Sequence, residues 1–173
     1  MVTRRQFLRA GIVTGVALTA LGTWYWSARE TRFDLAGRFA LQPKERDIVA
    51  ALVPVILAGA LSEGVTRTAM IERTVTGVEQ AIAGLSAATQ EEVRQLFALL
   101  GFAPTRIALA GLVSDWRDAN ATEVATFLER WRFSAIGLLR SAYAALHDLV
   151  LGAWYGTSES WEAIGYPGPP EII

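Results

Sequence analysis

The feature that most constrains this chain is the spacing of its apolar residues, which recur three and four positions apart over most of its length. Between residues 65 and 85, for example, Val75, Val78 and Ile82 share one side of a helical wheel, whereas Arg73 and Gln80 lie opposite. This period is typical of an amphipathic α-helix, and no segment alternates with a period of two for long enough to be a strand. The sequence therefore predicts an all-α fold, a compact bundle of about five or six helices.

The expected helices are bounded by ordinary start and stop signals. Pro43 with Glu45 starts one that runs toward Leu57, and Pro54 should kink it or end its regular part. Because residues 48–61 carry no charge, we expect this helix to be buried on most sides. A second helix is expected at 65–85, and a third starts from a cap at Ser86 or Thr89 and ends at Gly101. A short turn follows at 105–112. The last two helices are expected at 123–132, capped by Asn120 or Thr122, and at 134–154, the longest.

Composition excludes several kinds of chemistry. The 173 residues include no Cys and one His, so disulfides, thiolate metal sites, and the usual zinc and Ser-His-Asp sites are excluded. The formal net charge of -1 gives no reason to expect nucleic acid as a partner. If the protein takes part in redox or hydrolytic chemistry, we expect a partner to supply the reactive groups.

The N-terminus has the order of an export signal. Arg4, Arg5 and Arg9 occur without an acid, and residues 10–28 carry no charge. The segment Thr3-Arg4-Arg5-Gln6-Phe7-Leu8-Arg9 resembles a twin-arginine (Tat) signal, in which Arg4, Arg5, Phe7 and Leu8 would be read by the export receptor. Residues 1–28 are therefore interpreted as a twin-arginine signal or N-terminal anchor, 29–41 as a tether, and 42–173 as a single helical domain.

Two fates of the signal stay open. Ala20-Leu21-Gly22 meets the small-x-small cleavage pattern only loosely, and Trp24-Tyr25-Trp26 follows at once. Trp and Tyr favour the membrane interface, and an uncharged run of about 20 residues is long enough to cross a bilayer. Cleavage and retention as a tether to the inner membrane are both compatible with this segment.

Catalytic candidates are few. His147 lies near the end of the long helix beside Asp148, and Asp115 and Asp118 are three residues apart, but neither set has the further groups that a catalytic or metal site needs. The glycines at 84, 101 and 111 are isolated, so no phosphate-binding loop is present. We accordingly assign no catalytic, cofactor-binding or metal-binding residue, no cofactor, and no enzymatic activity to this chain.

The C-terminus is unusual for a tail. Three Pro and two Gly occur within residues 165–170, which opposes helix and central strand and favours an extended segment. Trp161, Ile164 and Tyr166 add large apolar area beside these prolines. Such a segment either closes the core of its own domain or docks on a partner, and the sequence leaves both open.

These residues carry a resemblance that covers nearly the whole chain. The Trp154-Tyr155-Gly156 step, the ending Ser160-Trp161-Glu162-Ala163-Ile164-Gly165-Tyr166-Pro167-Gly168-Pro169-Pro170, the twin-arginine signal and the helix opening Pro43-Lys44-Glu45-Arg46 resemble the gluconate 2-dehydrogenase subunit 3 family. Members of that family are small Tat-signalled subunits of periplasmic flavoprotein dehydrogenases of the glucose-methanol-choline (GMC) type. They accompany a large FAD subunit without an export signal, often together with a cytochrome subunit.

The resemblance implies a non-catalytic small subunit that binds the folded large subunit, stabilises it, and lends it the signal for passage through the Tat translocon into the periplasm. The implied docking segment lies within residues 154–173, at Trp154, Tyr155, Trp161, Ile164, Gly165, Tyr166, Pro167, Gly168 and Pro170. Two other hypotheses remain. One is a stand-alone periplasmic or membrane-tethered helical protein that binds a small apolar ligand near residues 48–61, and the other is a cofactor-free enzyme that uses His147, Asp115 or Asp118.

Overall fold

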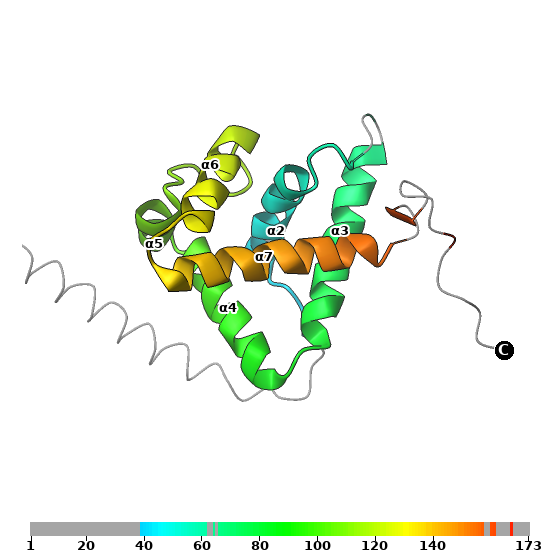
Figure 1. Ribbon diagram of the computed structural model, residues 1–173, viewed down its shortest axis with the longest axis horizontal. Helices are drawn as coiled ribbons and strands as arrows, with labels where there is room; N and C mark the ends of the chain where they lie inside the picture. The colour runs from blue at the N-terminus through cyan, green and yellow to red at the C-terminus, as the bar shows by residue number, and fades with distance from the viewer. Residues whose placement is uncertain (1–38, 62–63, 65, 158–159, 162–166, 168–173) are drawn as a thin grey trace, which may run out of the picture. The chain divides into compact units, whose positions relative to one another are not determined.

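The computed structural model describes residues 39–61, 64, 66–157, 160, 161 and 167. The predicted fold class is confirmed, because these residues form α-helices and one π-helical turn but no strand (Figure 1). With the labels of Figure 1, the elements are α2 (Pro43–Ile56), α3 (Thr66–Ala83), α4 (Ala87–Gly101), α5 (Ala103–Thr105), the π-helical turn η1 (Arg106–Ala110), α6 (Ala121–Arg132) and α7 (Gly137–Tyr155). In the part of the chain that is described, no helix combines the length and the hydropathy that crossing a bilayer requires.

Helix α2 is the centre of the bundle. It contacts α3, α4, α6 and α7, and its side chains Ile48, Val49, Leu52 and Val53 are at most 1% exposed. The helix begins as expected, with Pro43 in its first turn and the Glu45 carboxylate accepting the Gln42 N–H at 2.7 Å. Pro54 lies within the last turn of α2, and the helix ends two residues later at Ile56.

Helix α7 crosses α3 at a point where side chains are small. A Cβ atom built on Gly77 of α3 would lie 3.1 Å from the Cβ of Ala153 of α7, which is closer than two carbons normally approach. The glycine therefore lets the two helix backbones come close together. Figure 1 shows α7 lying across the front of α2 and α3.

The segment between α4 and α6 is held by the indole groups of two buried tryptophans. Trp116 Nε1 donates to the Leu100 carbonyl at 2.8 Å, and Trp131 Nε1 donates to the Leu109 carbonyl at 2.9 Å. The short turn expected at 105–112 is present as α5 and η1, and it ends at Gly111, whose φ of 75° favours glycine. This segment packs its backbone onto the end of α6.

Two capping predictions are resolved, and one boundary is corrected. Ser86 is the N-cap of α4 and Asn120 the N-cap of α6, and each side chain accepts a backbone N–H of the first turn. Helix α7 was expected to begin at Ser134 but begins at Gly137. The Ser134 hydroxyl accepts the Ile136 N–H at 3.1 Å, a local turn that competes with helix formation and leaves residues 133–136 as a connection.

Candidate functional site

The end of α7 carries the described part of the predicted docking segment. Trp154 is 4% exposed and belongs to the hydrophobic core, whereas the next residue, Tyr155, is 53% exposed. The half-buried Trp161 donates its indole N–H to the Tyr155 carbonyl at 2.7 Å, and Pro167 is exposed. The Trp-Tyr pair is therefore split, with Trp154 packing in the core of its own domain and Tyr155 facing solvent.

Hydrogen bonds fix the first turn of chain after α7. The Thr157 hydroxyl donates to the Trp154 carbonyl at 2.7 Å, and the Ser160 hydroxyl donates to the Thr157 carbonyl, also at 2.7 Å. The Thr157 hydroxyl and the Trp161 indole thus each donate to a carbonyl in the last turn of α7, where the helix leaves its own carbonyls free. The other predicted docking residues, Ile164, Gly165, Tyr166, Gly168 and Pro170, lie outside the described residues, as do the export residues Arg4, Arg5, Phe7 and Leu8.

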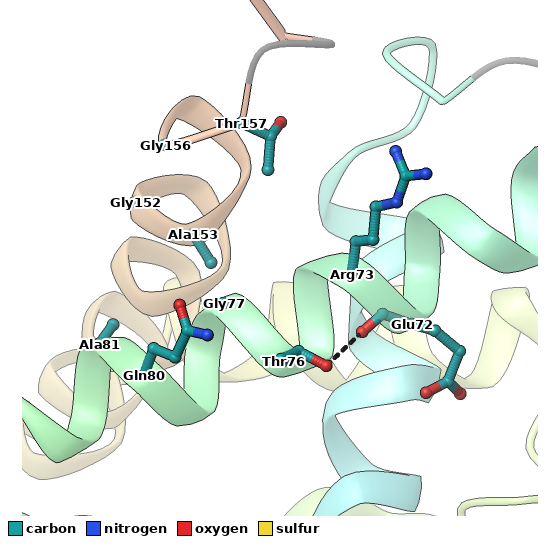
Figure 2. A pocket seen from close by; sticks show the side chains of 10 residues that line it. All are labelled: Glu72, Arg73, Thr76, Gly77, Gln80, Ala81, Gly152, Ala153, Gly156 and Thr157. Carbon is teal, nitrogen blue, oxygen red and sulfur yellow. Dashed lines mark hydrogen bonds between the residues drawn. The ribbon is translucent and has the colours of Figure 1, made fainter.

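An open groove of about 640 Å³ lies between α3 and α7 near this end. Figure 2 shows its lining, with Thr76 donating its hydroxyl to the Glu72 carbonyl at 3.0 Å. The groove exists because several lining residues lack a long side chain, and a Cβ on Gly152 would meet nothing within 4 Å. Its ten lining residues are Glu72, Arg73, Thr76, Gly77, Gln80, Ala81, Gly152, Ala153, Gly156 and Thr157.

The outward side of α7 continues from this groove along the whole helix. We call this side the α7 face, and its exposed members are Gly137, Leu138, Ser141, Ala144, Ala145, Asp148, Gly152 and Tyr155. It has a large apolar or aromatic side chain at each end, Leu138 and Tyr155, and small residues over most of the length between them. Asp148 is its one charged member, and Arg140 lies at its edge. A solvent-facing helix side normally carries many more charges.

Two of the three catalytic candidates, His147 and Asp115, contact neighbouring groups, and the third, Asp118, is exposed. His147 is half-buried, its Nδ1 lies 3.6 Å from the Asp148 carboxylate, and its ring lies 5.5 Å from that of Tyr143. Asp115 accepts the Trp116 N–H at 2.8 Å and binds the Arg106 guanidinium at 3.0 Å. No group of three His, Asp or Glu side chains within the described ranges could hold a metal ion.

Sequence reasoning named Tyr155 but missed the rest of the α7 face. The signal was available, because α7 contains only Arg140, His147 and Asp148 as ionisable side chains other than tyrosine in 19 residues. A helix with so few charges is predicted to be buried on most sides, yet here one side faces solvent.

In comparisons with known proteins, no protein family, no curated sequence and no solved structure matches this chain.

Proposed function

We propose that this chain is the non-catalytic small subunit of an FAD-dependent dehydrogenase of the GMC type. It docks on the folded large subunit, stabilises it, and supplies the twin-arginine signal that takes the pair through the Tat translocon to the periplasm. A cytochrome subunit could complete the complex at the inner membrane. The resemblance of the two ends of the chain supports this assignment, and the α7 face is the structural observation that carries the docking step.

The α7 face has the properties of a surface that another protein covers. Its small residues, Ser141, Ala144, Ala145 and Gly152, let an approaching backbone come close, and Leu138 and Tyr155 offer larger contacts at its ends. Depletion of charge is what distinguishes the core of a protein interface from the rest of a surface. The rim is charged, with Arg140 at one edge and Glu72 and Arg73 across the groove.

Docking is tested with a charge placed in the middle of the α7 face. The full chain with Ala145→Glu is purified by affinity from its native cells and compared with the wild-type chain for a co-purifying protein that shows flavin absorbance. We expect the flavoprotein to be lost, because the new carboxylate would be desolvated without a partner. Ala88→Glu, at another exposed helical alanine, is the matched control and should retain the flavoprotein. A wild-type chain that brings down no flavoprotein would contradict the proposal.

Export is tested separately from docking. Replacing Arg4 and Arg5 by Lys should leave dehydrogenase activity in the cytoplasm, since the signal depends on the paired guanidinium groups. The measurement is activity in the periplasmic and cytoplasmic fractions, with the Arg9→Lys variant as the control. Normal periplasmic activity in the double variant would overturn the escort role, even if the two proteins still co-purify.

Binding of a small apolar ligand near residues 48–61 is the second candidate. The hollow that borders this helix has a volume of about 280 Å³ and is lined mainly by apolar or aromatic side chains, among them Ala50, Ala51, Pro54 and Trp116. Ligand sites usually measure roughly 300–1,000 Å³. This hollow lies just below that range, so we place the small-subunit role first. A stable monomer that co-purifies with no flavoprotein would reverse that order.

A further inference from the structure

Most of the exposed large apolar side chains lie at one end of the bundle. Eight such side chains are exposed among the described residues, and six of them lie within residues 102–113 and 133–138. The first segment is joined to the end of α6 just before the second, because Trp131 of α6 donates its indole N–H to the Leu109 carbonyl of η1 at 2.9 Å. In Figure 1 this end carries α5 and the start of α7.

The connection between α6 and α7 is the most exposed part of this end. Phe133 is 75% exposed, Ile136 60% and Leu138 77%, and we call these three residues the apolar tip. Side chains exposed to this degree have little contact with their own domain. Burying them elsewhere would remove a large apolar area from water.

The sequence around the apolar tip is rich in arginine. Residues 130–140 contain Arg130, Arg132 and Arg140 and no acid, and the nearest acid before them is Glu129. The Arg132 guanidinium lies 5.2 Å from the centre of the Phe133 ring, and Arg140 Nη1 donates to the Ser134 carbonyl at 2.6 Å, which ties it to the connection. The arginines therefore flank the apolar side chains on both sides in the sequence.

We propose that the apolar tip is a membrane-binding element that inserts into the interface of an anionic bilayer. Phe133, Ile136 and Leu138 would enter the boundary between headgroups and acyl chains, and the flanking arginines would contact lipid phosphates. An anionic bilayer fits these observations, because protruding apolar side chains can enter it while the net positive charge of the flanking residues is complementary to its surface. This inference goes beyond the small-subunit role and does not depend on it.

The position of the apolar tip is compatible with docking on the α7 face. Leu138 is in the first turn of α7 and Tyr155 is its last residue, so the helix separates them by about 26 Å at 1.5 Å per residue. The two surfaces share Leu138, and a bilayer contact at the tip leaves the rest of the α7 face accessible to a protein.

The test uses a local probe on the full chain. Residues 10–28 carry no charge and are expected to hold the chain on vesicles by themselves, so co-sedimentation would not report on the tip. Because the chain has no Cys, Leu138→Cys gives a single thiol for an environment-sensitive fluorophore. Leu85→Cys is the matched control, an exposed leucine beside the start of α4, at the opposite end of that helix from η1.

The labelled chains are reconstituted into vesicles of equal parts phosphatidylglycerol and phosphatidylcholine, or of phosphatidylcholine alone. With the anionic vesicles we expect the probe at position 138 to emit at shorter wavelength and to be quenched by acyl-chain nitroxide lipids, whereas the probe at position 85 stays in water. A probe at position 138 that remains in water would overturn the proposal. Equal burial at both positions, or protection of position 138 only by a co-purified protein, would overturn it as well.

Two further variants in the Leu138→Cys background separate the apolar and the charged contributions. Phe133→Ser with Ile136→Ser should abolish quenching on the anionic vesicles, and circular dichroism checks that the helices remain. Arg132→Gln should lower the inserted fraction on anionic vesicles by a factor of about five, whereas Arg132→Lys should preserve it. Equal insertion by the Gln and Lys variants would show that the arginine contributes no attraction to the bilayer.

Discussion

Helix α2 from residue 48 onward and helix α7 are both poor in charge, but their uncharged surfaces are covered to different extents. Helix α2 is surrounded by α3, α4, α6 and α7, so its apolar residues are covered within the chain. Helix α7 buries Leu146, Val150, Ala153 and Trp154 on one side and leaves the α7 face exposed on the other. An uncharged helix predicts burial, but it does not say whether the covering surface belongs to the same chain.

This difference is the reason for considering the α7 face as a binding surface. Apolar atoms make up much of any protein surface, so a single exposed leucine is not evidence of a binding site. A stripe of mostly small and apolar residues along a 19-residue helix is a different observation, because Asp148 is the one charged residue on that outward side. The core formed by the described residues does not include that stripe, and this is the observation on which the proposed docking rests.

The difference between α2 and α7 is tested most strongly by truncating one leucine in each helix. Leu52 of α2 is fully buried, so Leu52→Ala should lower the free energy of unfolding by about 2–5 kcal/mol through lost burial and a residual cavity. Leu138→Ala, at a leucine 77% exposed on α7, should change it by less than about 0.5 kcal/mol. Urea unfolding of the isolated chain measures both. Similar losses would mean that the α7 face is part of the core.

The buried Arg106 tests how much a charged group inside the bundle depends on its partner for stability. Arg106 is buried, its Nε has no hydrogen-bond partner, and its guanidinium depends on Asp115 at 3.0 Å. Asp115→Ala should lower the free energy of unfolding by about 1–3 kcal/mol, less than for a fully buried pair because the Asp115 side chain is 66% exposed. Asp115→Asn keeps an acceptor and should cost less, and the exposed Asp118→Ala is the control. Equal stability of the Asp115→Ala variant would show that water satisfies Arg106.

The bundle was predictable from the sequence, but its outer surface was not. Periodicity and capping located α2, α3, α4 and α6 closely, because Pro43, Ser86 and Asn120 act through bonds within a few residues of themselves. The start of α7 was placed three residues early, since the Ser134 turn competes locally with the helix.

The roles of adjacent residues were harder to predict. Trp154 and Tyr155 differ in exposure because one points into the packing of several helices and the other away from it, which depends on contacts far apart in the sequence. The buried Arg106 was missed for the same reason, since its partner Asp115 belongs to the loop that follows η1.

Two glycines near the α3–α7 crossing give the finest test, because Gly77 of α3 packs against the buried side of α7, whereas Gly152 lies on the open side of α7. A Cβ at position 77 would lie only 3.1 Å from the Ala153 Cβ, and Gly77→Val adds branched atoms beyond that Cβ. This substitution should therefore lower the free energy of unfolding by about 1–3 kcal/mol. Gly152→Ala meets nothing within 4 Å and should stabilise it by about 0.5–1 kcal/mol, because alanine loses less backbone entropy in a helix. Both are measured by urea unfolding of the full chain. A loss of stability in Gly152→Ala would mean that the groove is already filled by this chain, which would remove the open surface on which docking depends.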